Sequence, residues 1–132
     1  NQRAFGPVEQ LAAKYDAALS SHPIVTPLSK APNRTHAHHI YVVRIDFTQL
    51  KTNKSTFFQA LRAEGIGANV HYIPVHLHPF YQERLGTKPG QCPIAEQAYE
   101  QIISLPIFPT MTDQDSQDTI QAMLKLTEAY QK

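Results

Sequence analysis

The stretch HIYVVRID, residues 39–46, is the part of the sequence that most clearly predicts a structural element. It is rich in β-branched and aromatic residues, which favour the pleated, half-buried surface of a β-sheet. We therefore predict a central strand at residues 39–46. Arg44 and Asp46 lie on the same face of this strand and are placed to pair. An exposed ion pair contributes about 0–1 kcal/mol and indicates no chemistry.

The segment after this strand has the signals of a helix followed by a second strand. Asn53 or Ser55 can cap the helix, and Gly65 can supply its left-handed end. The predicted buried face of the helix consists of Phe57, Phe58 and Leu61. A short strand is predicted next, at Gly67–Ile73.

The segment before the central strand is predicted to be a helix and then a loop. Pro7 suits the first turn of a helix, where its missing N–H costs nothing, and Pro23 ends the helix. Apolar residues recur between them at helical spacing: Val8, Leu11, Ala12, Tyr15 and Leu19. Residues 27–35 contain two prolines and few large apolar residues, so they are predicted to form a loop.

The second half of the chain alternates between proline-rich segments and regular elements. Residues 74–91 are predicted to form a long, proline-broken loop, and a loop of this length without regular structure is often functional. A third helix is expected at Pro93–Gln101. A short apolar strand follows at Ile102–Leu105 and ends at Pro106.

The last helix is predicted to have Thr112 as its cap. The carboxylates of Asp113 and Asp115 suit the positive N-terminal end of this helix. Its inward stripe is predicted to consist of Ile120, Met123, Leu124 and Thr127. Together the elements predict an α+β fold with a small, mostly antiparallel sheet of three to four strands and helices packed on one face. The length suits a single domain over residues 1–132.

Composition and charge exclude several classes of function. Hydrophobic residues make up 42% and charged residues 17% of the chain, as in an ordinary globular protein. The net charge of +1 gives no support to a nucleic-acid or membrane surface, and the apolar runs are too short to span a bilayer. The single cysteine, Cys92, excludes an internal disulfide and fits a reducing cytoplasm. We interpret it as a packed or capping residue.

Six of the seven histidines fall in two clusters. The segment HYIPVHLHPFY, residues 71–81, contains three of them together with two tyrosines and two prolines. Imidazoles and phenols hydrogen-bond sugar hydroxyls and phosphate oxygens, and prolines lower the cost of ordering a binding loop. If residues 69–73 are extended, Tyr72 faces one side while His71 and Ile73 share the other. The alternative is a proline-rich connection whose histidines are partly solvated.

The second cluster consists of His36, His38 and His39, at the start of the central strand. His36 and His38 share one face of an extended chain, and His39 takes the other. Clustered histidines raise the question of a metal. The histidines of the first cluster, however, lie at spacings of five and two with no carboxylate among them, which does not match a zinc site. No metal site is therefore predicted.

Longer stretches of the sequence resemble one known family. GIGANVHYIPVHLHPFYQERLG, residues 65–86, and CPIAEQAYEQIISLPIFPTMTDQD, residues 92–115, are similar to the C-terminal domain of DegT–StrS sugar aminotransferases. The resemblance runs from about Val8 to Tyr130 and includes AAKYDAAL and HHIYVVRID. Within the family, HYIPVH and YQERLG look most like enzymes that aminate C4 of a UDP-linked 4-keto-6-deoxy sugar on the route to pseudaminic acid.

The resemblance implies a fold-type-I aminotransferase that uses pyridoxal 5'-phosphate, takes its amino group from glutamate and works as a homodimer. This chain would be the small C-terminal domain. A large N-terminal domain, absent from these residues, would hold the cofactor and the Schiff-base lysine. Three residues match the segment that lines the sugar-nucleotide pocket of the family: His71, Tyr72 and His76. His39 and Tyr41 match a His-x-Tyr strand motif, so His39 is a fourth candidate for substrate binding.

None of the lysines of this sequence lies in the cofactor motif of the family. The chain alone is therefore expected neither to form an aldimine nor to transaminate, and no catalytic or cofactor-binding residue is assigned to it. His78 stands where many relatives carry glutamine, which leaves the substrate open. Two alternatives remain. One is a stand-alone small-molecule-binding or regulatory domain that uses the His/Tyr segment as its pocket, and the other is a His-rich metal-dependent enzyme.

Overall fold

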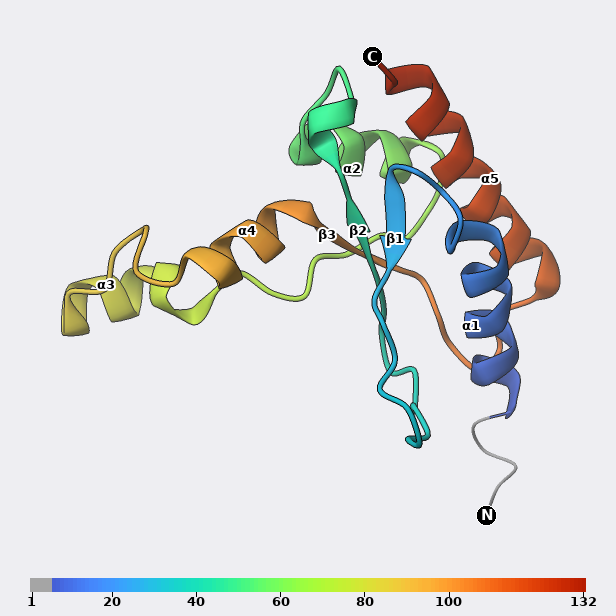
Figure 1. Ribbon diagram of the computed structural model, residues 1–132, viewed down its shortest axis with the longest axis horizontal. Coiled ribbons are helices and arrows are strands. Elements are labelled where there is room, and N and C mark those ends of the chain that lie inside the picture. Colours follow the sequence, from blue (N-terminus) through green and yellow to red (C-terminus); the bar gives the residue numbers. More distant parts are fainter. Residues whose placement is uncertain (1–5) are drawn as a thin grey trace.

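Figure 1 shows the computed structural model of the chain, which describes residues 6–132. Its centre is a three-stranded antiparallel sheet in the order β1-β2-β3. The strands are β1 (Val25–Pro27), β2 (Tyr41–Ile45) and β3 (Ile102–Leu105). The predicted central strand is indeed central, and the α+β fold with a small antiparallel sheet is confirmed. The three-residue strand β1 was not predicted, because it is too short to show an alternating pattern.

The central strand β2 alternates in burial as a half-buried strand should. Tyr41, Val43 and Ile45 are buried, whereas Arg44 is exposed. The predicted pair of Arg44 with Asp46 is wrong, because the chain turns at Asp46. The carboxylate instead accepts hydrogen bonds from the Thr48 backbone N–H at 3.1 Å and the Gln49 side chain at 2.8 Å. It thereby caps the short helix η1 (Phe47–Gln49).

Three helices pack together beside the sheet: α1 (Gly6–Leu19), α2 (Lys54–Ala63) and α5 (Asp113–Tyr130). Helix α5 contacts both α1 and α2, and α1 contacts β1. Figure 1 shows α1 and α5 side by side along one face of the sheet. The largest fully buried side chains between these helices and the sheet include Tyr15, Phe57, Leu61, Ile45, Ile103 and Met123. Of the helices in residues 6–132, none is both long enough and apolar enough to cross a membrane.

The predicted helix signals are mostly confirmed. Asn53 caps α2 by accepting a hydrogen bond from the Thr56 backbone N–H at 2.9 Å, and Gly65 after it has a φ of 81°. Thr112 caps α5 in a capping box with Asp115. The predicted inward stripe of α5 is wrong at Leu124, which is 38% exposed. The buried residues of α5 are Ser116, Thr119, Ala122, Met123, Leu126 and Thr127.

Residues 70–101 form a projection that we call the arm. It contains the short helix η2 (Val75–Leu77) and the helices α3 (Pro79–Leu85) and α4 (Pro93–Gln101). Figure 1 shows the arm extending away from the sheet on the side opposite α1 and α5. The predicted bounds of α4 are confirmed. The prediction of a structureless loop at residues 74–91 is wrong, because Pro79 begins a helix that Gly86 ends in the left-handed conformation.

At the root of the arm, a single residue pair extends the sheet beyond β3. The predicted strand at Gly67–Ile73 is wrong, because only Asn69 pairs with an edge residue, Ser104 of β3. The two residues exchange both backbone hydrogen bonds, at 3.0 and 2.8 Å. No residue from Asn69 to Ile102 is buried. The large apolar side chains exposed along this stretch are Tyr72, Ile73, Val75, Phe80, Tyr81, Leu85 and Ile94.

Candidate functional site

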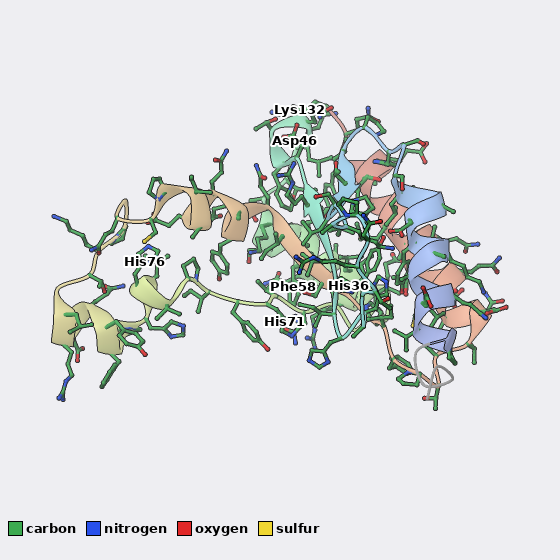
Figure 2. All side chains as sticks on the ribbon, turned by 60° about the horizontal axis from the view of Figure 1, so that its bottom comes forward. His36, Asp46, Phe58, His71, His76 and Lys132 are labelled. Carbon is green, nitrogen blue, oxygen red and sulfur yellow. The ribbon has the colours of Figure 1, made fainter. Side chains whose placement is uncertain are left out.

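The four substrate-binding candidates lie in three places rather than in one pocket. His71 and Tyr72 lie at the root of the arm, and His76 lies further out, in η2. Figure 2 shows His71 near the sheet with its helices α1, α2 and α5, which we call the body, and His76 between α4 and the turn that carries it. His39 lies in the exposed loop before β2, because the strand begins two residues later. The arm therefore groups three of the four candidates along one projection and leaves His39 apart.

At the root of the arm, a buried serine orients His71. The Nδ1 atom of His71 lies 2.8 Å from the Oγ atom of Ser104, whose residue is only 3% exposed. The ring of Tyr72 packs edge-on against the His71 ring, with centroids 4.7 Å apart and planes at 86°. Tyr72 is 73% exposed. The pair thus presents the Nε2 atom of His71 and the Tyr72 hydroxyl as polar groups without a partner in residues 6–132.

Further along the arm, His76 forms a hydrogen bond with a carboxylate. Its Nε2 atom lies 2.7 Å from Oε1 of Glu96, on α4, and both side chains are mostly shielded, at 11% and 22% exposed. The same carboxylate accepts hydrogen bonds from the backbone N–H of Gly90 at 2.9 Å and of Cys92 at 3.2 Å. The bonds from Gly90 and His76 lower the pKa of Glu96 and outweigh its desolvation. Glu96 is therefore a carboxylate at neutral pH.

Beside this pair the arm has a cavity of about 420 Å³. Its walls are largely apolar and come from η2, α3, the turn after α3 and the start of α4. His76, Tyr81, Leu85, Thr87, Cys92 and Ala95 are among its lining residues. A concave, largely apolar surface with few polar groups is typical of a small-molecule site. The cavity therefore makes the arm the candidate site.

The second histidine cluster lies beside a different, structural network. Tyr41 donates a hydrogen bond from its hydroxyl to Oδ1 of Asp16 at 2.6 Å, and Lys30 bonds Oδ2 at 2.5 Å. Burial and the bond to Asp16 raise the pKa of Tyr41, so its hydroxyl stays protonated. The rings of His36 and His38 lie 4.3 Å apart next to this network. The Tyr of the His-x-Tyr motif therefore ties β2 to α1, which is a packing role.

The described residues do not form a metal-binding cluster. Between residues 6 and 132, no three histidine, cysteine or carboxylate residues lie close enough together to hold a metal ion. Cys92 occupies the N-cap position of α4, but its side chain makes no capping hydrogen bond and is exposed. The interpretation of Cys92 as a packed or capping residue is therefore right only for its N-cap position, because its side chain neither packs nor caps.

The structure adds two site residues that the sequence reasoning missed, Glu96 and Ser104. Each orients one of the candidate histidines through a side-chain hydrogen bond. Glu96 stands four residues after the N-cap of α4, and a carboxylate near a helix start is a known signal. The pairing with His76 spans 20 residues, however, and no local pattern reveals it.

The domain defined by this sheet, its helices and the projecting arm matches one family. A family model described as the DegT/DnrJ/EryC1/StrS aminotransferase family matches residues 7–124. The chain therefore belongs to the DegT/DnrJ/EryC1/StrS aminotransferase family, and the resemblance found in the sequence is confirmed at this level.

The chain is also similar to individual proteins. It is 41% identical to the uncharacterized protein MJ1066 of Methanocaldococcus jannaschii over 119 residues, 89% of this chain and 31% of that protein. It is 38% identical to the spore coat polysaccharide biosynthesis protein SpsC of Bacillus subtilis over 117 residues, 87% of this chain and 30% of SpsC. The structure of Helicobacter pylori PseC, an aminotransferase involved in the biosynthesis of pseudoaminic acid, superposes with a TM-score of 0.85 at 28% identity. That match covers 96% of this chain and 33% of PseC. The chain thus spans about a third of the length of these proteins.

Proposed function

We propose that this chain is the small C-terminal domain of a pyridoxal-phosphate-dependent aminotransferase that transfers an amino group from glutamate to a nucleotide-linked 4-keto-6-deoxy sugar. The family match over residues 7–124 is the observation that supports this most strongly. The remaining two thirds of the relatives' length would form the large domain that holds the cofactor and its lysine.

The chemistry of the arm supports a role in binding substrate rather than cofactor. Pyridoxal phosphate needs a lysine amine and N–H groups for its phosphate. No lysine lines the arm cavity, and the N–H groups of Gly90 and Cys92 already bond Glu96. Lys14, Lys30 and Lys125 form ion pairs outside the arm, and Lys54 of α2 bonds the backbone carbonyl of Tyr99 on α4, away from the cavity. The residues of the arm therefore do not fit the cofactor, and we assign no cofactor step to this chain.

What the arm can supply is recognition of a polar ligand. The free Nε2 atom of His71 and the hydroxyl of Tyr72 can each donate or accept a hydrogen bond. The His76 ring adds a third polar group at the wall of the cavity, next to apolar side chains. Hydroxyl groups and phosphate oxygens of a nucleotide-linked sugar need such groups, and the apolar walls suit the face of a ring. The residues we propose to bind substrate are His71, Tyr72 and His76, with His39 as a more distant candidate.

Two relatives support the choice of sugar. SpsC is a spore coat polysaccharide biosynthesis protein, and PseC takes part in the biosynthesis of pseudoaminic acid. We therefore propose amination at C4 of a UDP-linked sugar, the reaction of an altrosamine transaminase, in the cytoplasm. Most of the large apolar side chains exposed in the described residues lie on the arm, and a gathering of exposed apolar surface can mark an interaction site. They support a homodimer in which the large domain or the second subunit covers the arm.

The proposed activity is tested with the longer protein that contains this chain. The purified protein should absorb visible light as a lysine–cofactor adduct. It should convert a UDP-linked 4-keto-6-deoxy sugar and glutamate into the amino sugar and 2-oxoglutarate, both detected by mass spectrometry. Residues 1–132 alone should be colourless with added cofactor. Stoichiometric zinc and no transamination by the longer protein would instead support the metal-dependent alternative.

The assignment of the arm to substrate is tested by variants of the same protein. His71→Ala and Tyr72→Phe should raise the KM for the nucleotide sugar by about tenfold, the effect of one or two lost hydrogen bonds. They should leave cofactor absorbance unchanged. The matched control is His36→Ala, an exposed histidine of the β1–β2 loop, which should change neither. Equal loss of cofactor and of substrate affinity in the arm variants would contradict the assignment.

A further inference from the structure

The Glu96 carboxylate joins two parts of the arm that are distant in sequence. Through Oε1 it reaches His76 of η2, and through both oxygens it reaches the backbone N–H of Gly90. The turn that it fixes follows α3, and the Oγ atom of Thr87 in that turn donates to the backbone carbonyl of His76 at 2.7 Å. His76 is therefore held at both its ring and its backbone by the same end of the arm.

This geometry decides which ring nitrogen of His76 is available. A carboxylate accepts hydrogen bonds and donates none, and the lowered pKa of Glu96 keeps it in that form. The Nε2 atom of His76 must therefore carry the proton in their 2.7 Å contact. In a neutral imidazole the other nitrogen is then an acceptor. Nδ1 of His76 has no partner among residues 6–132.

We infer that Glu96 is a positioning residue for His76: it holds the Nε2–H group, so that Nδ1 is the atom that the neutral ring presents to the substrate. The group that meets Nδ1 is then a hydrogen-bond donor, as a sugar or ribose hydroxyl is and an ionised phosphate oxygen is not. At the root of the arm the other ring nitrogen is the free one, because the Oγ atom of Ser104 contacts Nδ1 of His71 and leaves Nε2 without a partner. The role of Glu96 in substrate use rests on the proposed function, whereas its effect on the ring does not.

The first experiment examines the ring itself in the 132-residue chain. The chain is labelled with ¹⁵N-histidine, and the long-range ¹H–¹⁵N spectrum of His76 is recorded at pH 8. We expect a protonated Nε2 and an unprotonated Nδ1, and in Glu96→Ala a mixture of the two tautomers. The control is Gln97→Ala, an exposed neighbour on α4, which should leave the His76 spectrum unchanged. A proton on Nδ1 in the wild-type chain, or no change in Glu96→Ala, would overturn the inference.

The second experiment uses the longer protein and a double-mutant cycle. Glu96→Ala and His76→Ala should each raise the KM for the nucleotide sugar by about tenfold with little effect on kcat. The double variant should lose no more than His76→Ala alone, because Glu96 acts through His76. Glu96→Gln, whose carbonyl oxygen can still accept from Nε2–H, should recover part of the loss.

A structural role of Glu96 alone gives a different pattern. If Glu96→Ala costs a further tenfold in the His76→Ala background, Glu96 acts through the turn at residues 87–92, and the inference is wrong. Failure of the proposed function is distinguishable, because then the wild-type longer protein turns over no nucleotide-linked keto-sugar while the tautomer of His76 is as expected.

Discussion

The body and the arm of this domain are stabilised in different ways. In the body, α1, α2, α5 and the sheet enclose a core in which Tyr15, Phe57 and Met123 are fully buried. In the arm, no residue from 69 to 102 is buried, and hydrogen bonds join η2 to α3, to the turn after α3 and to α4. The free energy of folding therefore comes from the body, since burial of apolar surface is the dominant favourable contribution.

The ends of the helices show the same difference. In the body, the side chains of Asn53 and Thr112 cap α2 and α5. In the arm, the N-cap residues of α3 and α4, His78 and Cys92, make no side-chain capping bond, and each helix begins with a proline. Glu96 takes part of this role for α4 and also binds His76. In the body the capping side chains stabilise helices, whereas in the arm Glu96 both bonds the start of α4 and holds a residue of the candidate site.

The largest contrast should come from removing one phenylalanine in each region. Phe57→Ala in α2 removes a fully buried ring and should lower the free energy of unfolding by about 3–5 kcal/mol. Phe80→Ala in α3 removes a ring that is 60% exposed and should change it by less than about 0.5 kcal/mol. Urea denaturation of the 132-residue chain measures both. A comparable loss in the two variants would mean that the arm is part of the core.

A smaller and pH-dependent effect is expected at the contact between β2 and α1. Burial raises the pKa of Asp16, but hydrogen bonds from Lys30 and Tyr41 outweigh burial, and the pKa is lowered. A lowered carboxyl pKa stabilises the folded state above the ordinary value of about 4, and this contribution is lost as the pH falls through the folded-state pKa. Tyr41→Phe should cost about 1–2 kcal/mol at pH 7 and progressively less between pH 4 and pH 2.

Denaturant titrations of Tyr41→Phe across this pH range provide the measurement. Tyr130→Phe is the matched control, because the Tyr130 hydroxyl has no hydrogen-bond partner in residues 6–132. The free energy of unfolding of Tyr130→Phe should equal that of the wild type at every pH. A cost for Tyr41→Phe that stays constant from pH 7 to pH 2 would show that the charge of Asp16 does not contribute.

The smallest effect is expected at the helix caps. Thr112→Ala removes the capping box of α5 and should cost about 1 kcal/mol, a fall in Tm of roughly 4 °C. Cys92→Ala changes the equivalent position of α4, where the side chain makes no capping bond, and should leave Tm within about 1 °C. Thermal unfolding followed by circular dichroism measures both. A larger fall in Tm for Cys92→Ala than for Thr112→Ala would show that the helix cap in the arm contributes more to stability than the cap in the body.

The body could be predicted from the sequence because its elements are buried on one face. The apolar spacing of residues 8–19 and the β-branched run at residues 41–45 predicted α1 and β2. The predictions failed where burial does not shape the sequence. In the arm, α3 has no buried residue, so its sequence has one proline and exposed aromatics but no buried apolar stripe. The pairing of Asn69 with Ser104 is a single bridge, so the strand predicted at residues 67–73 is wrong.

The candidate site could be predicted only residue by residue. His71, Tyr72 and His76 were identified from their chemistry and from the family resemblance, and the structure places all three on the arm. Their partners Ser104 and Glu96 lie 33 and 20 residues away. A contact over such a distance depends on how the chain folds back along the arm, and local sequence patterns contain no information about it.

The bridge between Asn69 and Ser104 has a consequence for how such proteins diversify. It is the point where the segment that enters the arm leaves the sheet, held there by two backbone hydrogen bonds, whereas the returning segment rejoins the sheet at Ile102. Backbone bonds do not depend on side-chain identity, and no residue from Val70 to Ile102 is buried. Residues 79–92 can therefore be lengthened, shortened or replaced while the rest of the domain folds as before. New substrate preferences can arise at the tip without compensating mutations in the core.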